Sequence, residues 1–113
     1  MRILVVEDEA LVAFMLEDIL ADLGCEVVGP ALHVDAALGL ASEERIDAAL
    51  LDVNLGGSDV YPVARKLEER RIPFAFVTGY AFGDTMGKYR SRPTVAKPFQ
   101  ATDLQRVLKA ILK

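Results

Sequence analysis

Five side chains that could carry chemistry each follow a short apolar run: Glu7, Asp8, Asp52, Thr78 and Lys97. Short apolar runs bounded by turn residues are typical of strands buried on both faces of a sheet. The carboxyl ends of parallel strands meet at one edge of a sheet, and ligands of open α/β folds bind at that edge. We therefore expect three carboxylates, a hydroxyl and an ammonium to lie together there.

Three carboxylates this close repel one another unless a cation lies among them. Magnesium takes oxygen ligands and often binds through one or two carboxylates together with phosphate oxygens. We expect Asp8 and Asp52 to be direct ligands, and Glu7 to bind directly or through water. The backbone carbonyl of Asn54 is the expected third protein ligand. The predicted cofactor is therefore Mg²⁺.

The remaining two side chains suit an anion beside Asp52. Lys97 offers a positive charge, Thr78 a hydroxyl donor, and Gly79 leaves room for the anion to approach the backbone. In phosphoryl transfer, metal and lysine neutralise the phosphoryl oxygens while a nucleophile lies in line. A carboxylate can serve as that nucleophile. The set of residues therefore predicts a phosphoryl site centred on Asp52.

Strand and helix patterns alternate along the chain. Strands are expected at residues 3–6, 26–30, 47–52, 73–77 and 94–96, and helices at 11–23, 34–44, 60–70 and from Thr102 or Asp103 to 112. This alternation predicts an α/β fold, a parallel sheet with helices on both faces. A further helix is expected within Tyr80 to Arg92. Because Gly83 and Gly87 weaken a helix, we expect it to be short, distorted or mobile.

The first helix carries apolar residues at helical spacing. We expect this stripe to face the core, with Glu17, Asp18 and Asp22 between its members. Gly24 is expected to end the helix as a C-terminal cap. The stripe consists of Leu11, Phe14, Met15, Ile19 and Leu23.

Composition limits the class of protein. The chain has 113 residues, enough for one domain spanning 1–113. A net charge of -4 does not suggest a nucleic-acid-binding protein, which would need a basic face. No apolar stretch approaches the roughly 18 residues that span a bilayer, and no signal peptide is recognisable. The single cysteine, Cys25, cannot form an internal disulfide. These features predict a cytoplasmic domain without a membrane partner.

The site residues and their order resemble the receiver domain of two-component response regulators. The matching motifs are Glu7-Asp8, Asp52, Thr78 and Lys97-Pro98-Phe99, and the resemblance covers essentially the whole chain. It implies a flavodoxin-like sheet of order 2-1-3-4-5. It also implies that Asp52 accepts a phosphoryl group from a histidine of a sensor kinase or of a phosphotransfer protein.

The resemblance assigns further roles at the site. Mg²⁺ binding would fall to Glu7, Asp8 and Asp52, and phosphate contacts to Thr78 and Lys97. The peptide bond between Lys97 and Pro98 is expected to be cis, as in the family. Cis peptide bonds are essentially a proline feature.

Three features depart from the common family pattern. The acidic pair is Glu-Asp rather than Asp-Asp. Thr94 stands where the family normally has an aromatic residue that rotates inward when the domain is phosphorylated. Tyr80 is similar to the tyrosine of a mostly single-domain subgroup with a Phe-x-Thr-Gly-(x)-Tyr signature. Asn54 and Tyr80 would flank the path of a water that attacks the phosphorylated Asp52. We hypothesise that bulky Tyr80 slows self-dephosphorylation.

Simpler explanations exist for single residues. Asp8 could cap the first helix, and Asp52 could form a turn before two glycines. His33 lies near a helix start without a metal-type partner and is expected to be exposed or structural. Cys25 is expected to pack rather than react.

Other functions compete with a receiver. A dehalogenase-type phosphatase would need a general acid two residues after its nucleophile, where this chain has Asn54. Thr94 permits a pseudo-receiver that acts as an adapter without phosphorylation, whereas the retained Asp52, Thr78 and Lys97 argue against it. A nucleotide-binding domain would need a glycine-rich loop after the first strand, which is absent.

Overall fold

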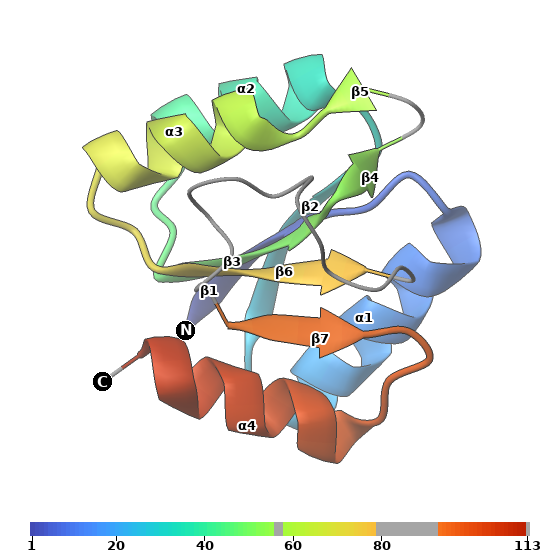
Figure 1. Cartoon of the computed structure of the whole chain (residues 1–113). Helices are drawn as coiled ribbons and strands as arrows, with labels where there is room; N and C mark the ends of the chain where they lie inside the picture. Colours follow the sequence, from blue (N-terminus) through green and yellow to red (C-terminus); the bar gives the residue numbers. More distant parts are fainter. Residues whose placement is uncertain (56–57, 79–92, 113) are drawn as a thin grey trace.

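Five parallel strands form the central sheet of the computed structural model, which describes residues 1–55, 58–78 and 93–112. The strands are β1 (Arg2–Val6), β2 (Glu26–Ala31), β3 (Ala48–Asp52), β6 (Phe74–Thr78) and β7 (Thr94–Ala96). Their order is β2-β1-β3-β6-β7 (Figure 1). Counted along the chain, this is the predicted order 2-1-3-4-5.

A small antiparallel ladder was not predicted. It pairs β4 (Asn54–Leu55) with β5 (Ser58–Asp59) directly after β3, in the segment that the sequence suggested was only a turn. The expected helix within Tyr80 to Arg92 lies outside the described residues, so its predicted short or distorted form stays a prediction.

Within the described residues, four helices cover the two faces of the sheet (Figure 1). Helices α2 (Val34–Glu43) and α3 (Tyr61–Glu69) lie on one face, and α1 (Ala10–Asp22) and α4 (Ala101–Ile111) on the other. Among the described helices, none is long and apolar enough to cross a membrane.

Alternate residues of each central strand supply the two cores. In β3, Ala49 and Leu51 pack with α2 and α3, whereas Ala48 and Leu50 pack with α1 and α4. Every residue of β3 and β6 is buried. This is why both strands read as continuous apolar runs, and why a polar residue at the end of such a strand stands out.

The predicted apolar stripe of α1 was wrong in its first half. Leu11, Phe14 and Met15 are 78%, 58% and 49% exposed, and the fully buried residues are Ala13, Leu16 and Leu20. The helix is apolar around most of its circumference, so helical spacing alone fits more than one stripe. Asp18 and Asp22 lie on the same face as the exposed three at intervals of three, four and seven residues, and their charges keep that face in solvent.

The end of α1 agrees with the prediction. Gly24 has φ of +81° and its N–H donates to the carbonyl of Ala21, while the N–H of Cys25 donates to that of Leu20. These two bonds form a Schellman motif, which requires a left-handed residue where only glycine is unstrained. The half-buried Cys25 packs against the core, as expected for a structural cysteine.

Candidate functional site

Backbone hydrogen bonds between neighbouring strands fix the residues at the carboxyl edge of the sheet. The N–H of Glu7 donates to the carbonyl of Ala31 at 2.9 Å, which ties the end of β1 to β2. The N–H of Lys97 donates to the carbonyl of Thr78 at 2.8 Å, which ties the end of β7 to β6. The site residues therefore sit at sheet positions that cannot shift without breaking the ladder.

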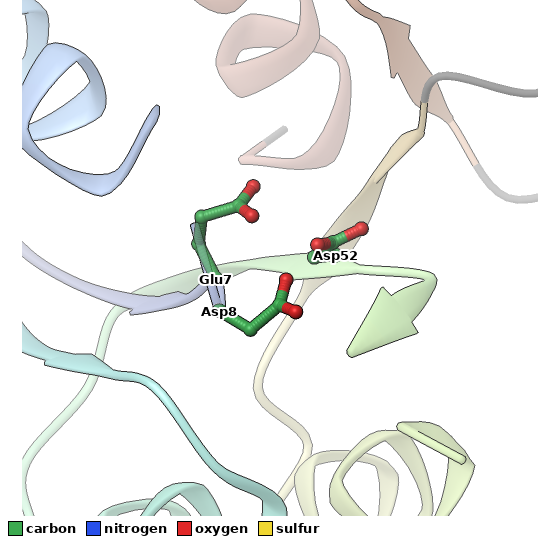
Figure 2. A group of neighbouring side chains, drawn as sticks. All are labelled: Glu7, Asp8 and Asp52. Carbon is green, nitrogen blue, oxygen red and sulfur yellow. The ribbon is translucent and has the colours of Figure 1, made fainter. Parts of the chain in front are cut away.

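Three carboxylates converge at this edge, as the sequence predicted. Oxygen atoms of Glu7, Asp8 and Asp52 all lie within 4.8 Å of one another (Figure 2). Glu7 is 0% and Asp52 3% exposed, and Asp8 is half-buried. Like charges this close in a buried place repel strongly, so the group has the composition of a site for a divalent cation.

Glu7 adds a second observation in favour of a cation. Its Oε2 accepts a hydrogen bond from the N–H of Glu9 at 3.1 Å, whereas its buried Oε1 has no hydrogen-bond partner among the described residues. Lys97 Nζ lies 3.0 Å from that Oε1, so this contact is an ion pair outside hydrogen-bond geometry. A buried carboxylate oxygen without a directed partner is costly, and a metal ligand role would satisfy it. The three carboxylates therefore fit Mg²⁺.

Lys97 joins these acids through its ammonium group. Nζ lies 3.0 Å from Glu7 Oε1, 3.3 Å from Glu9 Oε1 and 3.6 Å from Asp52 Oδ2. Burial lowers the pKa of Lys97, but contact with Glu7, the charges of Asp52 and Glu7 and the hydrogen bond to Glu9 together raise it above its usual value. The site therefore holds a permanent positive charge beside Asp52 at neutral pH.

Thr78 and the Lys97-Pro98 bond also lie where the sequence placed them. Thr78 is the last residue of β6 and only 3% exposed. The Lys97-Pro98 peptide is cis, as the resemblance implied, and a second cis bond, Gly29-Pro30, was not predicted. Thr94 is a half-buried residue of β7 paired with Phe76.

Glu9 is the site residue that sequence reasoning missed. It is the N-cap of α1, and its side chain makes no capping hydrogen bond but reaches Lys97 instead. Its place directly after Glu7-Asp8 was the available signal. The alternative role of Asp8 as the helix cap is wrong, because α1 begins at Ala10 and its N-cap is Glu9.

The remaining residues named from the sequence either make no contact with Lys97 or the acidic residues within the described structure, or lie outside it. His33 is an exposed N-cap of α2, as expected. Tyr80 and Gly79 lie outside the described residues, as does the side chain of Asn54, so their predicted roles stay predictions.

Known proteins resemble this chain in sequence and in fold. A family model described as the response regulator receiver domain matches residues 3–109. The chain is 34% identical over 116 residues to the phyllosphere-induced regulator PhyR of Methylorubrum extorquens, covering 98% of this chain and 43% of PhyR. The chain spans about half the length of the first curated relatives it matches, 52% and 43%.

Solved structures agree with the family model. The solution structure of SdrG from Sphingomonas melonis Fr1 matches with a TM-score of 0.87 and 43% identity, covering 99% of this chain and 96% of SdrG. Another structure shows SdrG in a BeF₃-activated conformation, with a TM-score of 0.85.

A third solved structure adds a metal to the comparison. The receiver domain of a sensor histidine kinase from Pseudomonas aeruginosa PAO1, with magnesium coordinated in its active site cleft, matches with a TM-score of 0.84 and 30% identity over 98% of this chain and 96% of that one. Together with its sheet order and the residues at the carboxyl edge, these matches show that the chain belongs to the receiver domains of two-component response regulators.

Proposed function

We propose that Asp52 accepts a phosphoryl group from a phosphohistidine, and that this acylphosphate controls what the domain binds or passes on. The observation that carries the proposal is the position of Asp52, at the carboxyl end of a fully buried strand, with Lys97 Nζ 3.6 Å from its Oδ2. Receiver domains are signalling domains rather than classical enzymes, so the chemistry serves a switch.

The transfer needs a nucleophile and charge compensation. A carboxylate oxygen of Asp52 attacks the phosphorus, the P–N bond of the phosphohistidine breaks, and its electron pair stays on the imidazole nitrogen. The ammonium group of Lys97 lies close enough to Asp52 to neutralise negative charge on the phosphoryl group during its transfer. Thr78, at the end of the neighbouring strand, offers a hydroxyl donor to the phosphoryl oxygens. The fixed backbone of the sheet edge supplies the orientation.

Magnesium is the proposed cofactor. Glu7, Asp8 and Asp52 would hold it, together with the backbone carbonyl of Asn54. A bound Mg²⁺ supplies positive charge to the phosphoryl oxygens. Within the described residues, Lys97 forms ion pairs with two of these carboxylates, those of Glu7 and Asp52.

The proposed phosphodonor is a sensor histidine kinase or a histidine phosphotransfer protein. Because Asp52 is only 3% exposed, the phosphohistidine must be brought close to the edge of the sheet. The protein that carries the phosphohistidine must therefore contact the surface around the site. Helix α1 begins shortly after the acidic residues in the chain and exposes Leu11, Phe14 and Met15 in its first half. An exposed group of large apolar side chains suits contact with a protein.

Acetyl phosphate can test the reaction without the unknown kinase. The protein is incubated with acetyl phosphate, with and without Mg²⁺, and its intact mass is measured. We expect a Mg²⁺-dependent gain of one phosphoryl group in the wild type, lost on treatment with hydroxylamine. Asp52→Asn should gain none, and Asp18→Asn, which changes an exposed acid of α1, should behave as the wild type.

A different result would change the assignment. If the wild type gains no phosphoryl group and binds no BeF₃⁻ with Mg²⁺, the phosphorylation-independent adapter becomes the better account. If Asp52→Asn gains the group as the wild type does, another residue is the acceptor.

A further inference from the structure

We propose that Glu9 is a positioning residue that holds Lys97 at the edge of the site and releases it when an anion binds beside Asp52. The inference rests on the proposed function, because the anion is the phosphoryl group or its analogue. It starts from the contact between Glu9 Oε1 and Lys97 Nζ, a hydrogen bond of 3.3 Å between residues 88 positions apart.

The contact is not explained by helix formation. Glu9 is the N-cap of α1, where a side chain that accepts an N–H bond of the first turn is favoured, and Glu is not among the preferred types. Its side chain makes no such bond. Its backbone N–H is held by Glu7 Oε2 at 3.1 Å, which fixes the start of the side chain within reach of Lys97.

The position of the Lys97 ammonium creates competition. Its single charge lies within 3.6 Å of three carboxylates, with a hydrogen bond to Glu9 and ion pairs to Glu7 and Asp52, so Nζ cannot turn toward a new anion and keep all three distances. An anion that joins Asp52 brings new oxygens that need the same ammonium. One of the existing contacts must therefore weaken.

Exposure decides which contact gives way. The side chains of Glu7 and Asp52 are 0% and 4% exposed, so neither carboxylate can exchange Lys97 for water. The side chain of Glu9 is 64% exposed and can be hydrated as soon as it is released. Glu9 is also outside the carboxylate group that fits a metal, so its release leaves the predicted Mg²⁺ ligands in place. Losing the Lys97 contact is therefore least costly in free energy at Glu9.

The proposal predicts a gain of anion affinity when the contact is removed. An exposed ion pair contributes about 0.2–1 kcal/mol, which corresponds to roughly a 1.4- to 5-fold change in an equilibrium constant. Glu9→Gln keeps a neutral acceptor at the same reach but loses the ion pair, so it should bind BeF₃⁻ up to about fivefold more tightly in saturating Mg²⁺. The affinity for Mg²⁺ alone should change much less, because Glu9 is not one of the predicted ligands.

Glu9→Asp separates the contact from the charge. Aspartate keeps the negative charge but is one methylene shorter, so it loses its reach to Lys97. If the contact matters, both variants bind BeF₃⁻ more tightly than the wild type. If only Glu9→Gln does, the effect is that of the charge on an approaching anion, and the proposed contact role is wrong. Unchanged or weaker binding in both variants also overturns it.

The experiment is a calorimetric titration of BeF₃⁻ in saturating Mg²⁺ on the three proteins, each checked for unchanged unfolding. Acetyl phosphate phosphorylation rates provide a second readout. The contact role predicts a lower half-saturating concentration for both variants, with a similar maximal rate. If the wild type itself binds no BeF₃⁻ and takes no phosphoryl group, the proposed function fails. If the wild type responds and the variants match it, only the role of Glu9 fails.

Discussion

At the scale of single residues, Lys97 provides positive charge that offsets the repulsion between the buried carboxylates of the site. It faces Glu7, Glu9 and Asp52 within 3.6 Å, and two of these carboxylates are almost completely buried. Removing one partner of a buried charge pair leaves the other charge uncompensated, which is far more costly than losing an exposed pair. Lys97 therefore supports both the proposed chemistry and the stability of the metal-free domain.

Lys97→Met should lower the free energy of unfolding by about 2–3 kcal/mol at pH 7 without Mg²⁺. This is less than the roughly 3–5 kcal/mol for a fully buried pair, because the Lys97 side chain is 18% exposed. Since the folded pKa of Lys97 is raised above 10.5, its contribution is complete below that pH and declines as the pH rises through the folded value.

Urea unfolding of both proteins from about pH 7 to about pH 11.5 checks this, since lysine titrates near the top of that range. We expect a constant difference in unfolding free energy up to about pH 10 and a smaller one above it. A difference that grows with alkaline pH would contradict the account.

Residue identities at the site could be predicted because each follows a buried strand. Asp52 and Thr78 end apolar runs at the carboxyl edge of the sheet, where ligands of open α/β folds bind. Glu9 could not be placed in the same way, since it lies one residue further along, outside any buried run. Its role depends on how far a flexible side chain reaches across the site, which spacing along the chain does not reveal.

At the scale of elements, α1 both ends the acidic motif and exposes an apolar surface. The buried side chains of Leu16 and Leu20 pack the helix against the sheet. The side chains of Leu11, Phe14 and Met15 are exposed to solvent. The exposed face continues into Asp18 and Asp22 toward the other end of the helix. A helix that keeps several large apolar residues in solvent offers a surface that suits contact with another protein, which agrees with the proposed docking of a phosphodonor.

The position of the buried face can be checked by two substitutions in α1. Phe14→Ser should change the free energy of unfolding by less than about 0.5–1 kcal/mol, because the residue is exposed and both types have similar helix propensity. Leu16→Ala should lower it by about 2–5 kcal/mol, since it empties a buried site. Denaturant unfolding of both variants is the measurement. Similar losses in the two would show that Phe14 is part of the core.

Strands and helices could be predicted where the sequence fits one pattern of buried residues. They were ambiguous where it fits two. β3 and β6 are apolar throughout, and the sequence could place them closely. In α1 the apolar residues encircle most of the helix, so spacing alone left the buried face open, and the aspartates should have decided it. The β4–β5 ladder is only two residues per strand, too short for any periodicity to reveal.

At the scale of the whole molecule, the sheet orders the chain so that distant segments share one edge. Residues 7–9, 52, 78 and 97 come together only because β1 and β3 are neighbours and β6 and β7 follow them. The alternation of strands and helices predicted the layers. The order of the strands followed from the resemblance, because periodicity records which residues are buried but not which strands are neighbours.

The acidic edge should make stability of the whole domain depend on magnesium. Without divalent cations, Asp8→Asn should stabilise the fold by about 0.5–2 kcal/mol, because it relieves repulsion at the expense of function. With Mg²⁺ at 100 times its dissociation constant, the wild type should gain about 2.7 kcal/mol. Asp8→Asn should gain much less.

Thermal and urea unfolding with and without MgCl₂ test this, with Asp18→Asn as the matched control. The control removes an exposed acid of α1 that lies outside the carboxylate group, so it should keep the full gain. If Asp8→Asn gains as much from Mg²⁺ as the wild type, Glu7, Asp8 and Asp52 do not hold the metal.

Among several neighbouring carboxylates, Asp52 is the proposed acceptor of the phosphoryl group. The most direct measurement is to treat the protein with acetyl phosphate and Mg²⁺, reduce the acylphosphate with borohydride, and locate the modified residue by peptide mass spectrometry. Reduction turns a phosphorylated aspartate into homoserine. The account predicts homoserine at position 52 alone. A modified residue at position 8, or modification of Glu7, would contradict it.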